Sequence, residues 1–235
     1  MTSAGVVALV GAGEFLASME PVDRQLLDYL GAAPRVVVLP TASAPDGPGV
    51  PERWANMGVD HFSRLGATVD PVMLLTRADA ESATLAAQIA AANVVYLSGG
   101  KPAYLLETLR QSACWRAIVG VFAAGGVVAG CSAGAMVLGG QVADFPRFWR
   151  TLPGLGLAPD FLVIPHFDEL PARMMRPAID RITRPRFIAG IDGGTALICA
   201  GGGWHVAGQK TVTIQARDGS ARTYRDGDDV ALSGD

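Results

Sequence analysis

The sequence predicts an α/β protein in which helices cover both faces of a mostly parallel β-sheet. In the first half of the chain, short β-branched runs alternate with longer stretches of helical periodicity, as expected for strands that alternate with helices. The chain has 235 residues, of which 50% are hydrophobic and 17% charged. This composition can bury a sizeable core, so it excludes a disordered chain and favours a single domain over residues 1–235.

The expected elements of the first half follow one another with short turns between them. The first strand, Val6–Val10, ends at a turn that contains Gly11 and Gly13. Further strands are expected at 35–39, 68–74, 94–97 and 127–129, and helices at 21–30, 52–65, 80–91, 102–110 and 112–124. The strands at 35–39 and 94–97 are almost continuously apolar, which is typical of strands covered on both faces.

The second half has a less regular pattern. A helix is expected from 132 to about 138, followed by an irregular stretch over 139–159 that is rich in Gly, Pro and aromatic residues. A strand at 161–164 and a helix at 172–182 come next. Strands are then expected at 187–191, 195–199, 204–206, 211–215 and 222–224. Glycine turns separate the last of these strands, which predicts antiparallel strands at the sheet edge near the C-terminus.

Charge and composition also narrow the class of function. The 19 basic and 22 acidic side chains give a net charge of −3 and form no long basic stripe, so a nucleic-acid partner is not expected. No apolar run approaches the ~20 residues that span a bilayer, and the first residues lack the basic region of a signal peptide. Three cysteines without metal-ligand spacing indicate reduced thiols in the cytoplasm, and we expect no metal and no cofactor.

The sequence Gly130-Cys131-Ser132-Ala133-Gly134 matches the G-x-S-x-G pattern between an expected buried strand and an expected helix. In this context the pattern predicts a nucleophile elbow with Ser132 at its apex. The alternative is an ordinary strand-to-helix turn in which the serine caps the helix. Cys131 precedes the apex, so its side chain is expected to point into the protein as a buried structural thiol.

A serine nucleophile requires a base, and the chain has three histidines. His166 directly follows the strand at 161–164, at the carboxyl edge of the sheet where ligands of α/β proteins bind. His61 lies on an expected surface helix and His205 in the late hairpin region, so His166 is the preferred candidate. Another strand ends at Ser98-Gly99-Gly100, where Gly99 lets the backbone approach a substrate and Gly100 is expected to supply an oxyanion N–H beside that of Ala133.

Three motifs in this order resemble the serine peptidase family of dipeptidase E (aspartyl dipeptidase) and cyanophycinase: Leu97-Ser98-Gly99-Gly100, Gly130-Cys131-Ser132-Ala133-Gly134-Ala135 and Pro165-His166-Phe167. The resemblance extends over residues 5 to 215. It implies the class I glutamine amidotransferase-like fold, a three-layer α/β/α sandwich, with the elbow serine as nucleophile and the histidine as base. The chain departs from the family where Lys101 and Gly193 replace residues that are usually Asn and Glu.

The resemblance also suggests which acidic residue orients the histidine and which charged side chains bind the substrate. Asp144, in Ala143-Asp144-Phe145-Pro146, is the first choice for the acid. Asp192 is the second choice and also a candidate substrate-binding residue. Arg173 and Arg176, in an arginine-rich segment after His166, and Lys101 are candidates to bind acidic groups of a substrate, because arginine binds carboxylates bidentately. A solvated helix face is the alternative explanation for the arginines.

The leading hypothesis is therefore a serine hydrolase that cleaves amide bonds in short peptides with an acidic residue. Its expected partner is a small peptide substrate, without nucleic acid or membrane, and the sequence is compatible with a homodimer without determining one. One alternative is a non-catalytic, ligand-binding relative, suggested by the replaced Asn and Glu. A glutaminase of the amidotransferase type is less favoured because that chemistry uses a cysteine at the apex.

Overall fold

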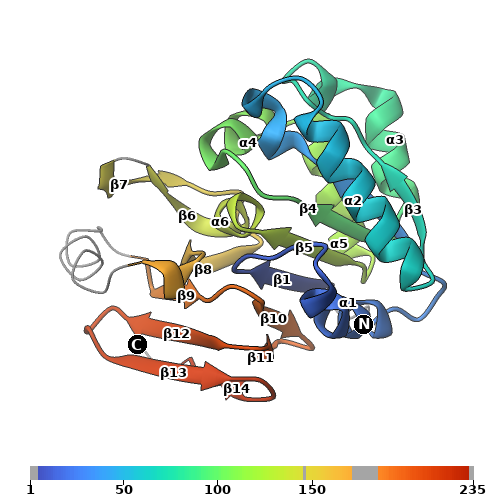
Figure 1. Ribbon diagram of the computed structural model, residues 1–235. Helices are drawn as coiled ribbons and strands as arrows, with labels where there is room; N and C mark the ends of the chain where they lie inside the picture. The colour runs from blue at the N-terminus through green and yellow to red at the C-terminus, as the bar shows by residue number, and fades with distance from the viewer. Residues whose placement is uncertain (1–4, 145–146, 171–184, 233–235) are drawn as a thin grey trace.

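The computed structural model describes residues 5–144, 147–170 and 185–232. An eight-stranded main sheet has the order β14-β11-β10-β1-β5-β4-β2-β3 (Figure 1). Its strands are β1 (Val6–Val10), β2 (Arg35–Leu39), β3 (Thr68–Pro71), β4 (Val94–Leu97), β5 (Val127–Cys131), β10 (Thr195–Ala200), β11 (Gly203–Gly208) and β14 (Asp229–Val230). The neighbours from β1 to β3 pair in parallel, whereas β10, β11 and β14 extend the sheet with antiparallel pairs.

Helices cover both faces of the main sheet. They are α1 (Glu20–Asp28), α2 (Val50–Arg64), α3 (Ala83–Ala91), α4 (Pro102–Leu109), α5 (Ala113–Ala123) and α6 (Ala133–Leu138). Successive strand side chains point to opposite faces, so Val7 and Leu9 of β1 pack with residues of α3 to α6. Val6 and Val10 of the same strand pack with residues of α1 and α2 on the other face. This arrangement confirms the predicted α/β fold with helices on both sides of a largely parallel sheet.

A second sheet of six strands lies beside the main one, with the order β13-β12-β9-β8-β6-β7 (Figure 1). Its strands are β6 (Gly139–Asp144), β7 (Arg147–Pro153), β8 (Ala158–Ile164), β9 (Phe187–Ile191), β12 (Thr211–Ala216) and β13 (Ala221–Arg225). The central pairs β6–β8 and β8–β9 are parallel, and the outer pairs are antiparallel. The expected antiparallel strands near the C-terminus are therefore divided between the two sheets.

The prediction that 139–159 is irregular is wrong, because β6, β7 and the start of β8 occupy this segment. Glycine and proline suggested a loop, but glycine in a strand also marks a close approach between backbones. A Cβ at Gly140 would lie 2.0 Å from the carbonyl oxygen of Pro159. Only glycine fits at this crossing of β6 with the chain entering β8, so the residue that suggested a loop is the one that permits the pairing.

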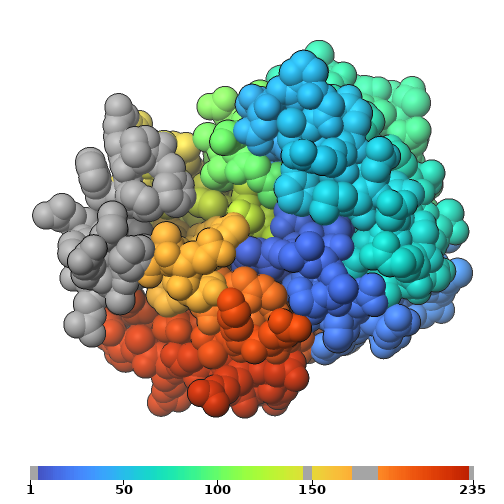
Figure 2. Space-filling model, viewed as in Figure 1, coloured from blue at the N-terminus to red at the C-terminus, as the bar shows by residue number. Residues whose placement is uncertain are grey.

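The carboxyl ends of β5 and β8 lie close together, since Ser132 and His166, which follow these strands, are in contact. In sequence, α6, β6 and β7 connect the end of β5 to the start of β8. Figure 2 shows the blue N-terminal segment, the green middle of the chain and the orange segment around β9 meeting on one face. The expected helix at 172–182 lies outside the described residues. Across the ranges given above, none of the helices is long and apolar enough to cross a membrane.

Candidate active site

Ser132 lies in a tight turn between β5 and α6, as the G-x-S-x-G pattern predicts. Its backbone has φ 49° and ψ −108°, a conformation that non-glycine residues rarely adopt. A Cβ at Gly134 would lie 2.3 Å from the carbonyl oxygen of Leu97, so the first turn of α6 packs against the end of β4 without room for a larger residue. Strain of this kind costs about 1–3 kcal/mol and is common at catalytic residues.

His166 approaches Ser132 from the second sheet. It directly follows Pro165 at the end of β8 and has a left-handed backbone, with φ 52° and ψ 36°. Its Nε2 lies 3.1 Å from Oγ of Ser132, within the reach required of a base that removes the hydroxyl proton. The nucleophile candidate thus belongs to one sheet and the base candidate to the other.

The turn that carries His166 is held by two hydrogen bonds to Asp168. Asp168 Oδ1 accepts a hydrogen bond from the backbone N–H of Gly193, at 2.9 Å, and its Oδ2 accepts one from Nζ of Lys210. Burial alone would raise the pKa of Asp168, but the hydrogen bonds from Lys210 and Gly193 outweigh that effect and lower the pKa below its ordinary value. Asp168 therefore acts as a charged acceptor that joins the histidine turn to the loop after β9.

Glu169 is the carboxylate that contacts His166 among the described residues. Its Oε2 lies 3.4 Å from Nδ1 of the histidine, on the ring edge opposite Ser132. The side chains are 40% exposed for His166 and 66% exposed for Glu169, so water screens the interaction. Glu169 was not among the candidate residues predicted from the sequence, although its position three residues after His166 could have indicated it.

The two acids suggested by the sequence flank the histidine strand on either side. Asp144 ends β6, which pairs with β8 through Gln141 and Leu162, and no described hydrogen bond joins it to His166. Asp192 follows β9 on the other side. Its Oδ2 accepts hydrogen bonds from the backbone N–H of Thr211, at 3.1 Å, and from the Thr211 hydroxyl, at 2.6 Å. These bonds hold the end of β9 against β12.

Two turns bring backbone N–H groups into the region of the serine. β4 pairs with β5, which brings Gly99 and Gly100 next to the elbow. The Gly99 N–H donates to Oε1 of Glu14, at 2.8 Å, whereas the Gly100 N–H has no acceptor among the described residues. Ala133 begins α6, and the first N–H groups of a helix have no partner within it. Gly100 and Ala133 therefore offer the free donors of this region.

Cys131 is fully buried and points away from the site. Its thiol donates to Oε2 of Glu14, at 2.8 Å. Burial, reinforced by the nearby Glu14 carboxylate, raises the pKa of the Cys131 thiol well above its ordinary value. A protonated, inaccessible thiol is a poor nucleophile. Glu14 was not among the candidate residues predicted from the sequence. The local feature that could have indicated it is its position directly after the Gly11–Gly13 turn.

Lys101 and Asp144 line a small cavity of about 170 Å³ whose remaining walls are Pro102, Ala103, Val142, Ala143 and Leu152. The ammonium group of Lys101 lies 3.2 Å from Oδ1 of Asp46 and is largely exposed. The cavity thus combines apolar walls with the carboxyl group of Asp144 and with Lys101, the cation that follows the Gly99–Gly100 turn. Arg173 and Arg176, the other candidates for binding acidic groups, lie outside the described residues.

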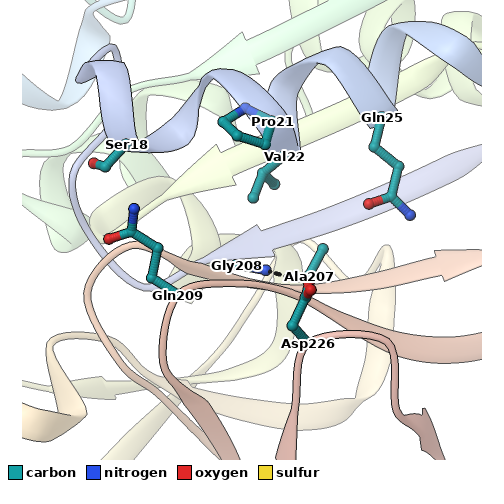
Figure 3. Close-up of a pocket in the computed structure, with 8 residues that line it drawn as sticks. All are labelled: Ser18, Pro21, Val22, Gln25, Ala207, Gly208, Gln209 and Asp226. Atoms are coloured by element: carbon teal, nitrogen blue, oxygen red, sulfur yellow. Dashed lines mark hydrogen bonds between the residues drawn. The ribbon is translucent and has the colours of Figure 1, made fainter.

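A larger cavity of about 370 Å³ lies between α1 and the end of β11 (Figure 3). Gln25 and Gln209 reach into it from opposite sides, and the Gly208 N–H donates to Oδ1 of Asp226 at its edge. No candidate catalytic residue lines it. Among the described residues, no three His, Cys, Asp or Glu side chains are grouped so that they could hold a metal ion.

The other two histidines have structural environments. His61 lies on α2, a helix with an exposed outer face as expected, but the histidine is on the inner face: it is 0% exposed, and its Nε2 lies 2.7 Å from Oδ2 of the equally buried Asp23. This face of α2 packs on the sheet, so the polar ring is buried with a partner, as buried polar groups require. His205 on β11 lies 3.1 Å from both Gln25 and Tyr29 of the α1 region.

A serine in a strained turn between a parallel strand and a helix, facing a histidine, is the arrangement of α/β-fold serine hydrolases. The chain belongs to peptidase family S51, whose family model matches residues 7–207. It is therefore a serine peptidase by family, which confirms the resemblance inferred from the three motifs.

Solved structures agree with this assignment. A peptidase from an acI-B1 Actinobacterium is 29% identical, with a TM-score of 0.89 over 98% of each chain. A protein assigned as Peptidase E from Listeria monocytogenes EGD-e is 16% identical, with a TM-score of 0.64 over 88% of this chain and 100% of the other. The second likeness is one of fold alone. A comparison with curated proteins gives no match.

Proposed function

We propose that this peptidase cleaves an amide bond in short peptides with Ser132 as nucleophile and His166 as general base. The observation that carries the proposal is the 3.1 Å separation between Oγ of Ser132 and Nε2 of His166. The strained backbone of Ser132 supports it, because a serine that only capped a helix would not need this conformation.

The reaction proceeds through an acyl-enzyme. Nε2 of His166 takes the Ser132 hydroxyl proton while Oγ bonds to the peptide carbonyl carbon, and the carbonyl π electrons move onto its oxygen. The N–H groups of Gly100 and Ala133 stabilise that oxyanion. The C–N bond then breaks and Nε2 gives its proton to the leaving amine. A water molecule repeats the sequence on the acyl-enzyme, which releases the carboxylic acid and restores Ser132.

Glu169 is our choice for the carboxylate that stabilises the protonated imidazole. The 3.4 Å contact with Nδ1 supports this role, and the high exposure of the pair limits the size of its contribution. The hydrogen bonds of Asp192 to Thr211 support a structural role for that residue instead. Asp144 as the orienting acid stays a prediction from the sequence. The two assignments differ in which substitution, at Glu169 or at Asp144, should lower kcat more.

The substrate class follows from the surroundings of the glycine turn. Lys101 lies next to Gly100 and lines the 170 Å³ cavity, so an acidic group of a short peptide would take the place of Asp46 as the partner of this cation. Lysine binds a carboxylate as a point charge. We therefore propose peptides with an acidic residue as the substrates of this site.

Two measurements test the proposal. A fluorophosphonate probe should label wild-type protein at Ser132 and fail to label the folded Ser132→Ala variant. A dipeptide library assayed for released amine should then give turnover, with acidic dipeptides preferred. Absence of both labelling and turnover would indicate a family member that binds ligands without hydrolysing them.

A further inference from the structure

Glu14 is a buried carboxylate that the proposed reaction does not use. It follows the turn at the end of β1, and the residue is only 7% exposed. A buried carboxylate is costly unless hydrogen-bond donors surround it. Glu14 has two donors, and they come from two other elements: the turn after β4 and the last residue of β5. These are the two segments from which the oxyanion donors and the nucleophile extend.

The first bond fixes the glycine turn. Oε1 of Glu14 accepts the Gly99 N–H at 2.8 Å. A Cβ at Gly99 would lie 2.7 Å from this same oxygen and 3.4 Å from Cβ of Ser132, so Glu14 and Ser132 both pack closely against Gly99, where only glycine fits. The Gly99 N–H is thereby engaged, whereas the Gly100 N–H, the next one in the turn, has no acceptor among the described residues.

The second bond fixes the elbow. Oε2 of Glu14 accepts the thiol hydrogen of Cys131 at 2.8 Å, and Cys131 is bonded to Ser132 through the peptide backbone. Because burial keeps this thiol protonated, it remains a donor to the carboxylate. The same carboxylate therefore connects the oxyanion turn and the nucleophile turn through its two oxygen atoms.

We propose that Glu14 is a positioning residue that holds the Gly99–Gly100 turn at a fixed distance from Ser132, so that the Gly100 N–H stays directed at the developing oxyanion. This inference rests on the proposed role of Ser132. Glu14 acts through the turn and does not touch the reacting atoms. Its effect should therefore appear in kcat, because oxyanion stabilisation is gained in the transition state rather than on substrate binding.

Two conservative variants separate the reach of the side chain from its charge. Glu14→Gln keeps the length and a neutral acceptor for the Gly99 N–H, whereas Glu14→Asp keeps the charge and withdraws the acceptor by one methylene. We expect Glu14→Asp to lower kcat about 10- to 100-fold with little change in KM, since loss of one oxyanion donor costs about 10²–10³ in kcat. Glu14→Gln should retain kcat within about fivefold of wild type.

The measurements are kcat and KM on the best dipeptide and the rate of fluorophosphonate labelling of Ser132, with folding compared by circular dichroism. Glu107→Gln, on the exposed face of α4, is a control that should leave every rate unchanged. Wild-type kcat in both Glu14 variants, a larger loss in Glu14→Gln than in Glu14→Asp, or a rise in KM alone would overturn the proposal. If wild-type protein neither labels nor turns over, the proposed function has failed instead.

Discussion

Asp168 accepts a hydrogen bond from the Gly193 N–H at 2.9 Å, which ties the turn carrying His166 to the loop that follows β9. Because β8 and β9 are parallel neighbours, this bond joins the two chain segments that follow their carboxyl ends, and one of these segments carries His166. The histidine thus depends on a contact two residues further along the chain for its position.

Asp168→Ala should lower kcat/KM about tenfold while the protein remains folded. Loss of the anchor lets the His166 turn shift, and misplacement of a catalytic group by about 1 Å can cost 10²-fold in rate. The measurement is kcat/KM for a dipeptide that the wild-type protein hydrolyses. Asp218→Ala is the matched control, since Asp218 bonds to Ser220 in an exposed turn outside the site. An equal loss in both variants would contradict a specific role for Asp168.

The lowered pKa of Asp168 predicts a pH dependence of stability. A carboxyl whose pKa is lower in the folded state stabilises the protein above its unfolded pKa, near 4, and loses this contribution as pH falls through the folded pKa. The free energy of unfolding of wild type should therefore exceed that of Asp168→Asn by a constant amount above about pH 5. The difference should shrink below about pH 4, as measured by urea unfolding. A difference that grows on acidification would have the wrong sign.

Ser132→Ala should abolish amine release, whereas Cys131→Ser should retain most of it. In the proposed reaction Ser132 carries the reacting oxygen, and the serine introduced at 131 keeps an O–H donor for Glu14 in a buried position. Steady-state kinetics and probe labelling of both folded variants test the assignment. Activity in Ser132→Ala together with its loss in Cys131→Ser would identify the cysteine as the nucleophile.

Three carboxylate variants distinguish the possible orienting acids. We expect Glu169→Gln to lower kcat about tenfold, because the exposed contact with Nδ1 is screened by water and so falls short of the ~10⁴ loss of the serine-protease template. Asp192→Asn should cost less, since its described bonds are to Thr211. If Asp144→Asn causes the largest loss of the three, Asp144 is the acid, as the sequence suggested.

Lys101→Met should reduce the preference for acidic substrates. We expect kcat/KM for a peptide with an aspartyl residue to fall about tenfold relative to the same peptide with asparagine, because only the former offers a carboxylate to the ammonium group. Lys210 is the other lysine of the chain, so Lys210→Met is the control. Because Lys210 bonds to Asp168, this variant lowers activity toward both peptides alike and should leave the aspartyl-to-asparagine ratio unchanged. An unchanged ratio in Lys101→Met would remove this residue from substrate recognition.

Several strands and the elbow at Ser132 could be predicted from the sequence alone. Short β-branched runs such as Arg35–Leu39 and Val94–Leu97 form strands with the expected bounds, because each is apolar enough to be buried on both faces. The elbow at Ser132 could also be predicted from neighbouring residues, since the small residues around it and the adjacent strand and helix lie within a few positions. Local sequence contains the physical information for elements of this kind.

Contacts between distant segments were decided by the tertiary structure alone. The pairing of β6 with β8 turned a glycine-rich stretch into strands, because backbone hydrogen bonds to a partner outweighed weak local propensity. The approach of Glu14 to Gly99 joins residues 85 positions apart, and the contact of Ser132 with His166 depends on how two sheets meet. The sequence determined most of the strands, the elbow and the family. Only the folded structure decided that β6 and β7 are strands and that Glu14 lies beside the Gly99 turn, because buried polar groups are satisfied by partners far along the chain.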